Sequence, residues 1–207
     1  MSDMSWLTDK AEKWPVPATE VLTTSSIITV RRDTVRMPDG QEAGRDVVEH
    51  PGAVAVLAMD DEDRVLLIRQ DRHPVARLLW EIPAGLRDVP GEPLEKTAQR
   101  ELLEEAGYLA AHWLVLADVY TSPGISSERL RVFLATGLTR VPDAERDYVP
   151  DHEEAHLMID WAPLDVVVSR FFAGELHNGV TAIGVLATHA ARQHAFAGLR
   201  GTDAPER

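Results

Sequence analysis

The chain has 207 residues, of which 44% are hydrophobic and 27% are charged, and its formal net charge is −13 at pH 7. This length suits one domain, or one domain with a small appendage, and the apolar share is sufficient for a buried core. The negative charge, with no basic patch to neutralise phosphates, argues against nucleic acid as a partner. Because the sequence contains no cysteine, disulfides, zinc–thiolate sites and thiol nucleophiles are excluded.

The first residues of the chain do not resemble a secretory signal. Residues 1–17 are charged throughout and lack the apolar stretch of a secretory signal. No apolar run in the sequence reaches the length that spans a bilayer, so we expect no membrane contact. These features predict a cytoplasmic location. Residues 1 to about 20 are expected to form an arm outside the core.

The next segments are predicted to be strands. Residues 25–37 are rich in β-branched side chains, and the turn sequence Pro-Asp-Gly at 38–40 joins them to a further extended pattern at 44–50, which predicts a hairpin. Residues 52–60 form a continuous apolar run, as in a strand that is buried on both faces. A further strand is expected over residues 65–72.

A Pro-Ala-Gly loop then leads to an amphipathic helix. Its apolar positions recur every fourth residue and are Leu94, Ala98, Leu102 and Ala106. Pro93 suits the first turn of this helix, and Gly107 suits the left-handed position that ends it.

The second half of the chain is predicted to contain two strands, a loop and two helices, at residues 112–124, 128–138, 141–156, 163–173 and 179–195. With strands before and after the central helix and further helices at the end, the order of elements predicts an α+β fold. We expect a mixed β-sheet between helices on both faces, with an N-terminal antiparallel β segment.

Three glutamates on the central helix are crowded together. Glu101 and Glu105 are four residues apart and share a face, and Glu104 lies beside Glu101. A solvated helix face would tolerate this crowding at about 0.2–0.5 kcal/mol per pair, so the helix alone favours that interpretation.

Three other features favour a metal site over a solvated face. The preceding Gly- and Pro-rich loop can offer backbone carbonyls, which together with carboxylates are the ligands preferred by Mg²⁺. Arg100 can hold one glutamate by a charge-assisted hydrogen bond and so fix the others. A second carboxylate pair, Glu153 and Glu154, lies in the later loop and could supply a general base for a water molecule.

With these residues in view, the segment "GLRDVPGEPLEKTAQRELLEEAGY" (85–108) resembles the box of the Nudix hydrolases. The positions in register with that box are Glu92, Arg100, Glu101, Leu102, Glu104, Glu105 and Gly107. Two positions depart from it, because Gly85 stands one residue farther from Glu92 than is usual and Tyr108 replaces an aliphatic residue. The flanking segments "LLWEIPAG" and "TSPGISSER", with Pro123 after the box, are similar to the ADP-ribose pyrophosphatase branch.

The resemblance implies the Nudix fold, an α/β/α sandwich, and a set of metal ligands. Glu101 and Glu105 match the metal-binding glutamates, and the carbonyl of Ala84 matches a backbone ligand. Glu104 supports this pair, and Arg100 matches the residue that orients the glutamates. Glu154 matches the loop glutamate that acts as base or as an additional metal ligand, with Glu153 as the alternative. The expected cofactor is Mg²⁺, with Mn²⁺ or another divalent cation possible.

The resemblance also implies substrate contacts and an assembly. The residues that fall where the branch contacts its substrate are Arg45, Arg72, Glu81, Ser122 and Glu128, although each also has an ordinary structural interpretation. Residues 1–50 would form the arm and a β segment for dimerisation, and residues 51–207 the hydrolase domain. The protein would be a homodimer with exchanged N-terminal strands.

The reaction that the resemblance implies is the hydrolysis of ADP-ribose to AMP and ribose 5-phosphate. Divalent cations would offset the repulsion between a strongly acidic protein and an anionic substrate. Two alternatives remain open: a Nudix hydrolase of another nucleoside diphosphate sugar, such as a mannose or glucose derivative, and a non-catalytic protein that binds ADP-ribose.

Overall fold

The computed structural model describes residue 4, residues 6–146 and residues 157–206. The chain divides into two compact units. The first comprises Met1–His50 and Gly124–Ser127, and the second comprises Pro51–Pro123 and Glu128–Arg207.

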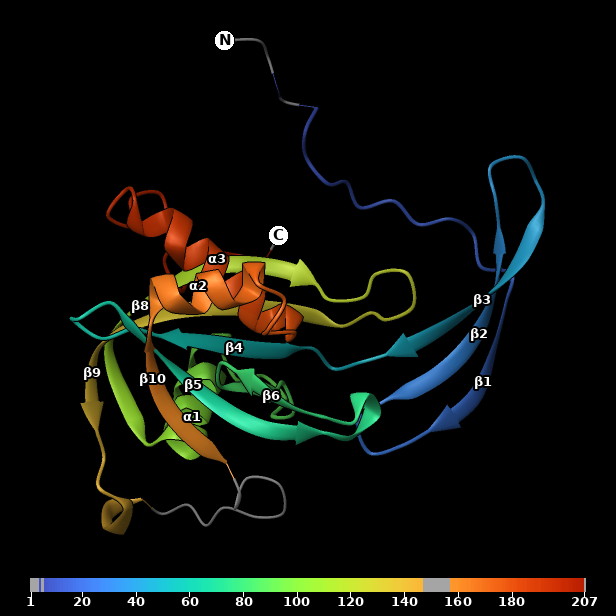
Figure 1. The fold of residues 1–207 in the computed structure, drawn as a ribbon. Coiled ribbons are helices and arrows are strands. Elements are labelled where there is room, and N and C mark those ends of the chain that lie inside the picture. The colour runs from blue at the N-terminus through green and yellow to red at the C-terminus, as the bar shows by residue number, and fades with distance from the viewer. Residues whose placement is uncertain (1–3, 5, 147–156, 207) are drawn as a thin grey trace. The chain divides into compact units, whose positions relative to one another are not determined.

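The first unit contains an antiparallel sheet of three strands in the order β1-β2-β3, formed by β1 (Ala18–Thr24), β2 (Thr29–Arg36) and β3 (Glu42–Glu49) (Figure 1). The predicted hairpin is confirmed as β2 and β3, with Gly40 at a φ of +85° in its turn. The sequence did not indicate β1. All seven of its residues are exposed, so it lacks the apolar alternation that identifies a half-buried strand.

The second unit contains two sheets. The strands are β4 (Ala53–Ala58), β5 (Arg64–Arg72), β6 (Arg77–Glu81), β7 (Ala84–Leu86), β8 (Tyr108–Tyr120), β9 (Arg129–Arg140) and β10 (Met158–Pro163), with short 3₁₀ helices η1 (His73–Val75) and η2 (Asp143–Glu145). One sheet is antiparallel, in the order β10-β5-β6, and the other is mixed, in the order β7-β4-β9-β8, with β4 parallel to β9. Strand β10 was not predicted from the sequence.

Helices cover both faces of the mixed sheet, and β4 explains why its sequence is apolar throughout. Every second residue of β4, beginning with Val54, packs with α1 (Leu94–Ala106), while Ala55 and Leu57 pack with α2 (Leu164–Phe172) and α3 (Gly179–Arg192). The predicted α+β fold, with a mixed sheet between helices and an N-terminal antiparallel β segment, is confirmed (Figure 1).

Among the helices of the described residues, none has both the length and the apolar character needed to cross a bilayer. The cytoplasmic location expected from the sequence stays a prediction.

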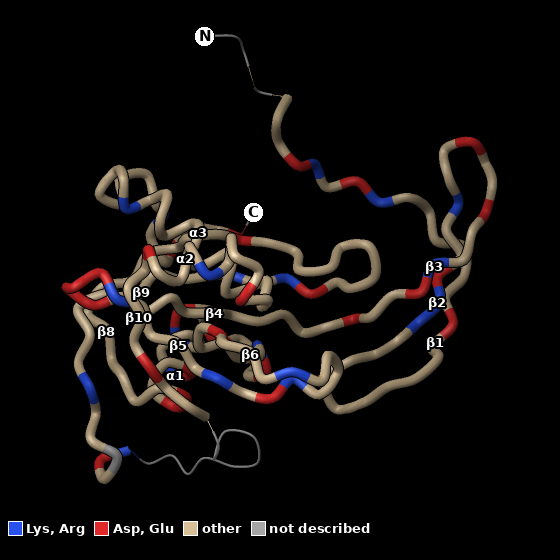
Figure 2. Tube along the Cα trace, in the orientation of Figure 1, with Lys and Arg blue, Asp and Glu red and all other residues tan. Residues whose placement is uncertain are grey.

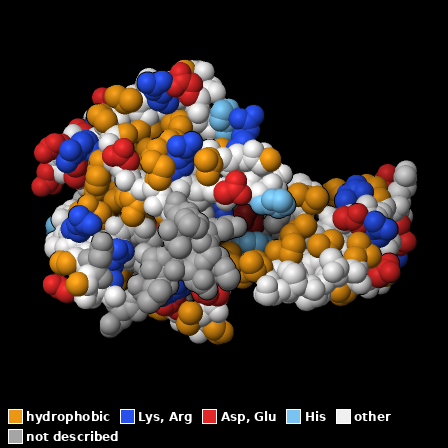
Figure 3. Space-filling view, turned by 60° about the horizontal axis from the view of Figure 1, so that its bottom comes forward, with side chains coloured by type: hydrophobic (Ala, Val, Ile, Leu, Met, Phe, Trp, Pro, Cys, Tyr) orange, Lys and Arg blue, Asp and Glu red, His pale blue; other side chains and the backbone are white. Residues whose placement is uncertain are grey.

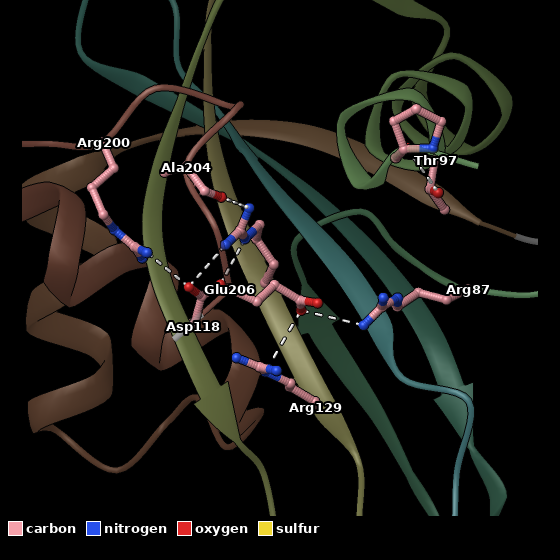
Figure 4. Close-up of polar contacts among 9 residues, drawn as sticks. Arg87, Thr97, Asp118, Arg129, Arg200, Ala204 and Glu206 are labelled. Atoms are coloured by element: carbon pink, nitrogen blue, oxygen red, sulfur yellow. Dashed lines mark hydrogen bonds and ion pairs between the residues drawn. The ribbon is translucent and has the colours of Figure 1, made fainter. Parts of the chain in front are cut away.

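A buried ion-pair cluster joins β8 and β9 to the C-terminal segment (Figure 4). Asp118 accepts hydrogen bonds from Arg131 Nε at 2.6 Å and from Arg200 Nη1 at 2.9 Å. Burial alone would raise the pKa of Asp118, but the hydrogen bonds from both arginines outweigh this effect and hold the pKa below its usual value. The cluster therefore depends on a charged Asp118.

We expect Asp118→Asn to lower the free energy of unfolding by about 3–5 kcal/mol, because Arg131, only 3% exposed, would keep a buried charge without its counter-ion. Denaturant unfolding of the second unit measures this change. Glu175→Gln is the control in the same unit, because Glu175 pairs with Arg170 on the surface and its loss should have a far smaller effect. A loss below about 1 kcal/mol for Asp118→Asn would show that the cluster is dispensable.

Candidate active site

The box glutamates are positioned by helix α1. Pro93 is the N-cap residue, and Gly107, at a φ of +74°, ends the helix with its N–H bonded to the carbonyls of Leu102 and Leu103. Glu101 and Glu105 are each only 9% exposed, while Glu104 is half-buried. The solvated-face interpretation is therefore wrong for Glu101 and Glu105, because a solvated face would leave both side chains in water.

Strand β7 lies directly against these glutamates. The sequence indicated a Pro-Ala-Gly loop here, but Ala84–Leu86 pair with β4 as a short strand. Val56 N–H bonds to the carbonyl of Pro83, and Arg87 N–H bonds to that of Gly52. Because bonded pairs alternate in an antiparallel ladder, the N–H and carbonyl of Ala84 face away from β4. The N–H of Ala84 donates to Glu105 Oε2 at 2.9 Å.

Glu101 occupies the space over Gly85. A Cβ atom at position 85 would lie 2.0 Å from Glu101 Cδ and 2.1 Å from Oε1, closer than any real carbon contact. The absence of a side chain at Gly85 is therefore what admits the Glu101 carboxylate. Gly85 opens the box segment in the sequence, but no local pattern explains why a glycine is needed there.

Arg100 is the hub of the acidic residues around the helix. It donates to Glu101 Oε1 at 2.7 Å and to Glu104 Oε2 at 3.1 Å, and its Nη2 lies 3.3 Å from Asp88 Oδ1 and 3.6 Å from Glu92 Oε2. One guanidinium thus faces four carboxylates. The acidic residues on α1 are drawn red in Figure 2. Because four carboxylates face a single positive charge, net negative charge remains here that cations could balance.

The pKa of Glu101 is raised to about 7, above its ordinary value of 4.5. The main cause is burial, which disfavours the charged carboxylate; Arg100 acts in the opposite direction, and Glu104 adds to the rise. Without a further cation, the Glu101 carboxylate is thus poised to hold a proton near neutral pH.

This raised pKa predicts that divalent cations compete with a proton at Glu101. A metal ligand must be deprotonated, so cation affinity should rise about tenfold from pH 6 to pH 8 and level off above the pKa of about 7. Calorimetric titration of the metal-free protein with Mn²⁺ in two buffers of different ionisation enthalpy measures both the affinity and the released proton. Equal affinity at pH 6 and pH 8, with no proton released, would contradict the assignment.

The donors of this site suit a hard divalent cation. Glu101 and Glu105 supply carboxylate oxygens, and the carbonyl of Ala84 is not used by the β4 ladder. Within residues 6–146 and 157–206, however, no group of three or more His, Cys, Asp or Glu side chains is arranged to hold a metal ion. A complete cation site therefore needs a donor in addition to the two helix glutamates. The predicted one, Glu154, lies outside the described residues, as does Glu153.

Two of the predicted substrate residues form one ion pair. Arg72 at the end of β5 donates from Nε to Glu81 Oε1 at 2.9 Å and from Nη2 to Oε2 at 2.6 Å. Glu81 is buried in β6, whereas the Arg72 side chain is 41% exposed. The bidentate contact fixes the plane of the guanidinium. The carboxylate of Glu81 therefore holds Arg72 in place, a relationship that sequence spacing did not reveal.

The other predicted substrate residues are placed separately. Ser122 is exposed after β8, and Glu128, just before β9, accepts a hydrogen bond from Thr121 Oγ1. Arg45 belongs to the first unit, where it is exposed on β3 and bonds to the carbonyl of Gly44. Among the predicted site residues, the structure therefore places Arg72 in contact with Glu81 and places the box residues in contact with one another.

Two further residues, Thr97 and Asp88, support the helix and were not predicted as site residues. Thr97, which is buried, donates from Oγ1 to Glu92 Oε2 at 2.8 Å, and this bond ties the entry loop to the first turn of α1. Asp88 is the second acidic residue of the entry loop to contact Arg100. The signal for Thr97 was its place on the same helix face as Arg100, three residues later.

Comparisons with known proteins agree with this geometry. A model of the NUDIX domain matches residues 49–181. The chain is 49% identical, over 173 residues, to the ADP-ribose pyrophosphatase of Mycobacterium tuberculosis (strain ATCC 25618 / H37Rv), which covers 84% of this chain and 82% of that protein. It is 43% identical, over 122 residues, to the ADP-ribose pyrophosphatase of Bacillus subtilis (strain 168), covering 59% of this chain and 65% of that protein.

A solved structure, a crystal structure of an ADP compounds hydrolase, has the same fold, with a TM-score of 0.74 at 20% identity, and covers 91% of this chain and 98% of that one. The chain therefore belongs to the NUDIX domain family, as the box residues predicted.

Proposed function

We propose that this protein is a metal-dependent hydrolase that splits the pyrophosphate of ADP-ribose into AMP and ribose 5-phosphate. The observation that carries the proposal is the pair of buried carboxylates, Glu101 and Glu105, packed against β7. The similarity to the ADP-ribose pyrophosphatases of M. tuberculosis and B. subtilis supports this choice of substrate.

The cation would be Mg²⁺, with Mn²⁺ or another divalent ion as a substitute. Glu101, Glu105, the carbonyl of Ala84 and Glu154 would hold it. When bound there, such a cation would offset the charge of the pyrophosphate and supply the Lewis acidity that activates water. This chemistry accounts for an anionic substrate on a protein of net charge −13.

Within this site, Arg100 has an orienting role. Its hydrogen bonds to Glu101 and Glu104 hold both carboxylates in place, so that the helix presents fixed oxygens rather than mobile side chains. Glu104 would support the ligand pair through this shared arginine.

Glu154 would accept the proton of the attacking water, with Glu153 as the alternative base. Glu154→Gln should then retain cation and substrate binding but turn over slowly. Slow turnover in Glu153→Gln alone would transfer the role to Glu153.

Arg72, held by Glu81, is suited to contact phosphate or nucleotide oxygens with its exposed edge. Arg45, Ser122 and Glu128 would complete the substrate contacts. The proposed homodimer with exchanged N-terminal strands is supported by β1, whose residues are all exposed and include Val21 at 61% and Leu22 at 42%. Apolar side chains on the surface are drawn orange in Figure 3.

A substrate panel tests the proposal. Purified protein with Mg²⁺ should cleave ADP-ribose, with release of AMP, at a higher kcat/KM than it cleaves nucleoside diphosphate mannose or nucleoside diphosphate glucose. Faster cleavage of one of these sugars would favour the alternative substrate class. Binding of ADP-ribose without cleavage of any compound would favour the non-catalytic alternative.

A further inference from the structure

The C-terminal segment Arg200–Glu206 runs along the mixed sheet of the second unit (Figure 4). Arg200 forms an antiparallel bridge with Val115, whose N–H bonds to the carbonyl of Arg200 at 2.8 Å, next to the bulge of the edge strand β8. Farther along, the carbonyl of Ala204 accepts a hydrogen bond from Arg131 Nη1 on β9 at 2.8 Å. The segment therefore passes from the edge of the sheet across two of its strands.

This segment lies on the same face of the sheet as helix α1. Leu130 and Val132 pack into the core beneath α2 and α3, so Arg131 between them points to the opposite face. Phe133, two residues later, packs into the core beneath α1. The segment and the box helix thus share one face of the sheet.

Glu206, near the end of the segment, forms ion pairs with two arginines, Arg87 and Arg129. Its Oε1 lies 3.2 Å from Arg87 Nη1 and 3.6 Å from Arg129 Nε. Arg87 directly follows β7, and Arg129 begins β9. The Glu206 side chain is only 20% exposed, so its charge is partly withdrawn from water and its ion pairs are stronger than surface pairs.

The ends of β4, β7 and β9 are close-packed where these arginines meet. A Cβ atom at Gly52 would lie 2.9 Å from the carbonyl oxygen of Arg129 and 3.0 Å from Arg87 Cδ, and Gly52 has a φ of +93°. The carbonyl oxygen of Gly52 also accepts a hydrogen bond from the N–H of Arg87 at 3.1 Å. Because Arg87 directly follows Leu86, the last residue of β7, a movement of Arg87 would also shift β7.

Strand β7 needs such an anchor. It has three residues, and within the described residues it pairs only with β4, in three registered pairs. Yet Ala84 bonds to Glu105 and Gly85 borders Glu101, so a small shift of β7 would displace both carboxylates.

We propose that Arg87 and Glu206 are positioning residues that hold β7 in register with the box glutamates, so that the C-terminal segment acts as a clamp on the cation site. This inference rests on the proposed function, because it assumes that Glu101 and Glu105 bind the cation. Both would act through β7, and neither is proposed to touch the reacting atoms.

The test is Mn²⁺ binding to the full-length, metal-free protein without substrate, with free Mn²⁺ counted by electron paramagnetic resonance. Glu206→Gln and Arg87→Gln should each weaken binding by about 3–10-fold, somewhat less than the loss of a residue bonded directly to a ligand. The double variant should bind no more weakly than Glu206→Gln, because that substitution already breaks the pair with Arg87 as well as the contact with Arg129. Arg87→Lys should recover part of the affinity, because a lysine can still pair with Glu206.

Two controls separate the possible failures. Glu175→Gln removes a carboxylate whose ion pair with Arg170 is on the surface, and it should bind Mn²⁺ as the wild type does. Glu101→Gln should lose binding. If Glu206→Gln and Arg87→Gln bind normally, or only lower the melting temperature, while Glu101→Gln loses binding, the clamp is wrong and the cation site stands. If Glu101→Gln binds normally, the proposed cation site itself is wrong.

Discussion

Glu101→Gln is expected to lower kcat/KM for ADP-ribose by at least about 10³-fold, equivalent to about 4 kcal/mol of transition-state stabilisation. The amide keeps the shape of the side chain but loses the charge that a cation requires. Glu105→Gln should cause a similar loss and should also disturb β7, because Glu105 accepts the N–H of Ala84. Steady-state assays with Mg²⁺ measure both effects.

The same Glu101→Gln substitution should stabilise the metal-free protein at high pH. Since the folded-state pKa of Glu101 is raised to about 7, the folded protein is most stable when Glu101 is protonated, and this stability is lost as pH rises through 7. At pH 8, in the presence of a chelator, the glutamine variant should therefore unfold with a free energy on the order of 3 kcal/mol higher than the wild type. Chemical denaturation at pH 5 and pH 8 tests the sign.

A matched control lies on the same helix. Glu95 bonds to Gln99 one turn later and takes no part in the contacts with β7, so Glu95→Gln should change neither activity nor stability appreciably. Full turnover by Glu101→Gln would show that Glu101 is not a required cation ligand. A variant less stable than the wild type at pH 8 without metal would show that burial does not raise the pKa of Glu101.

Gly85→Ala is expected to remove activity without unfolding the protein. Gly85 has no positive φ, so alanine suits its backbone, but the new Cβ would meet Glu101 Cδ at 2.0 Å. The glutamate is the flexible partner and must move, and a displacement of about 1 Å at a catalytic group costs on the order of 10²-fold in rate. We therefore expect kcat/KM to fall by about 10²-fold or more, with little change in melting temperature.

Gly179→Ala controls for the added methyl group, because a Cβ atom at Gly179 meets nothing within 4 Å. Activity above about half of the wild-type level in Gly85→Ala would mean that Glu101 can serve the reaction from another position. The contact with β7 would then not define the site.

The sequence predicted the central helix well because several local signals agreed there. The apolar residues placed every four positions from Leu94 to Ala106 match the buried face of the helix, and Pro93 and Gly107 mark its two ends. Strands β1 and β10 were missed for the opposite reason. Their residues are exposed or half-buried, so they carry little apolar alternation. Strand β7 is only three residues long, and the Pro-Ala-Gly sequence at 83–85, where it begins, is also typical of a turn.

The site was predictable where residues are neighbours along the chain. Glu101, Glu105 and Arg100 share one helix, so their spacing already implied contact. The partners that complete the site are remote in sequence. Ala84 meets Glu105 across 21 residues, and Arg87 meets Glu206 across 119, and both contacts are created by the packing of the mixed sheet. No local pattern could indicate them.

The most direct measurement for the whole account is the metal dependence of ADP-ribose cleavage, with both products identified by chromatography. With Mg²⁺, the wild-type protein should release AMP and ribose 5-phosphate in equal amounts, and a chelator or Glu101→Gln should abolish the release. Intact ADP-ribose in the presence of Mg²⁺, or equally fast cleavage by Glu101→Gln, would contradict metal-dependent hydrolysis at the box glutamates.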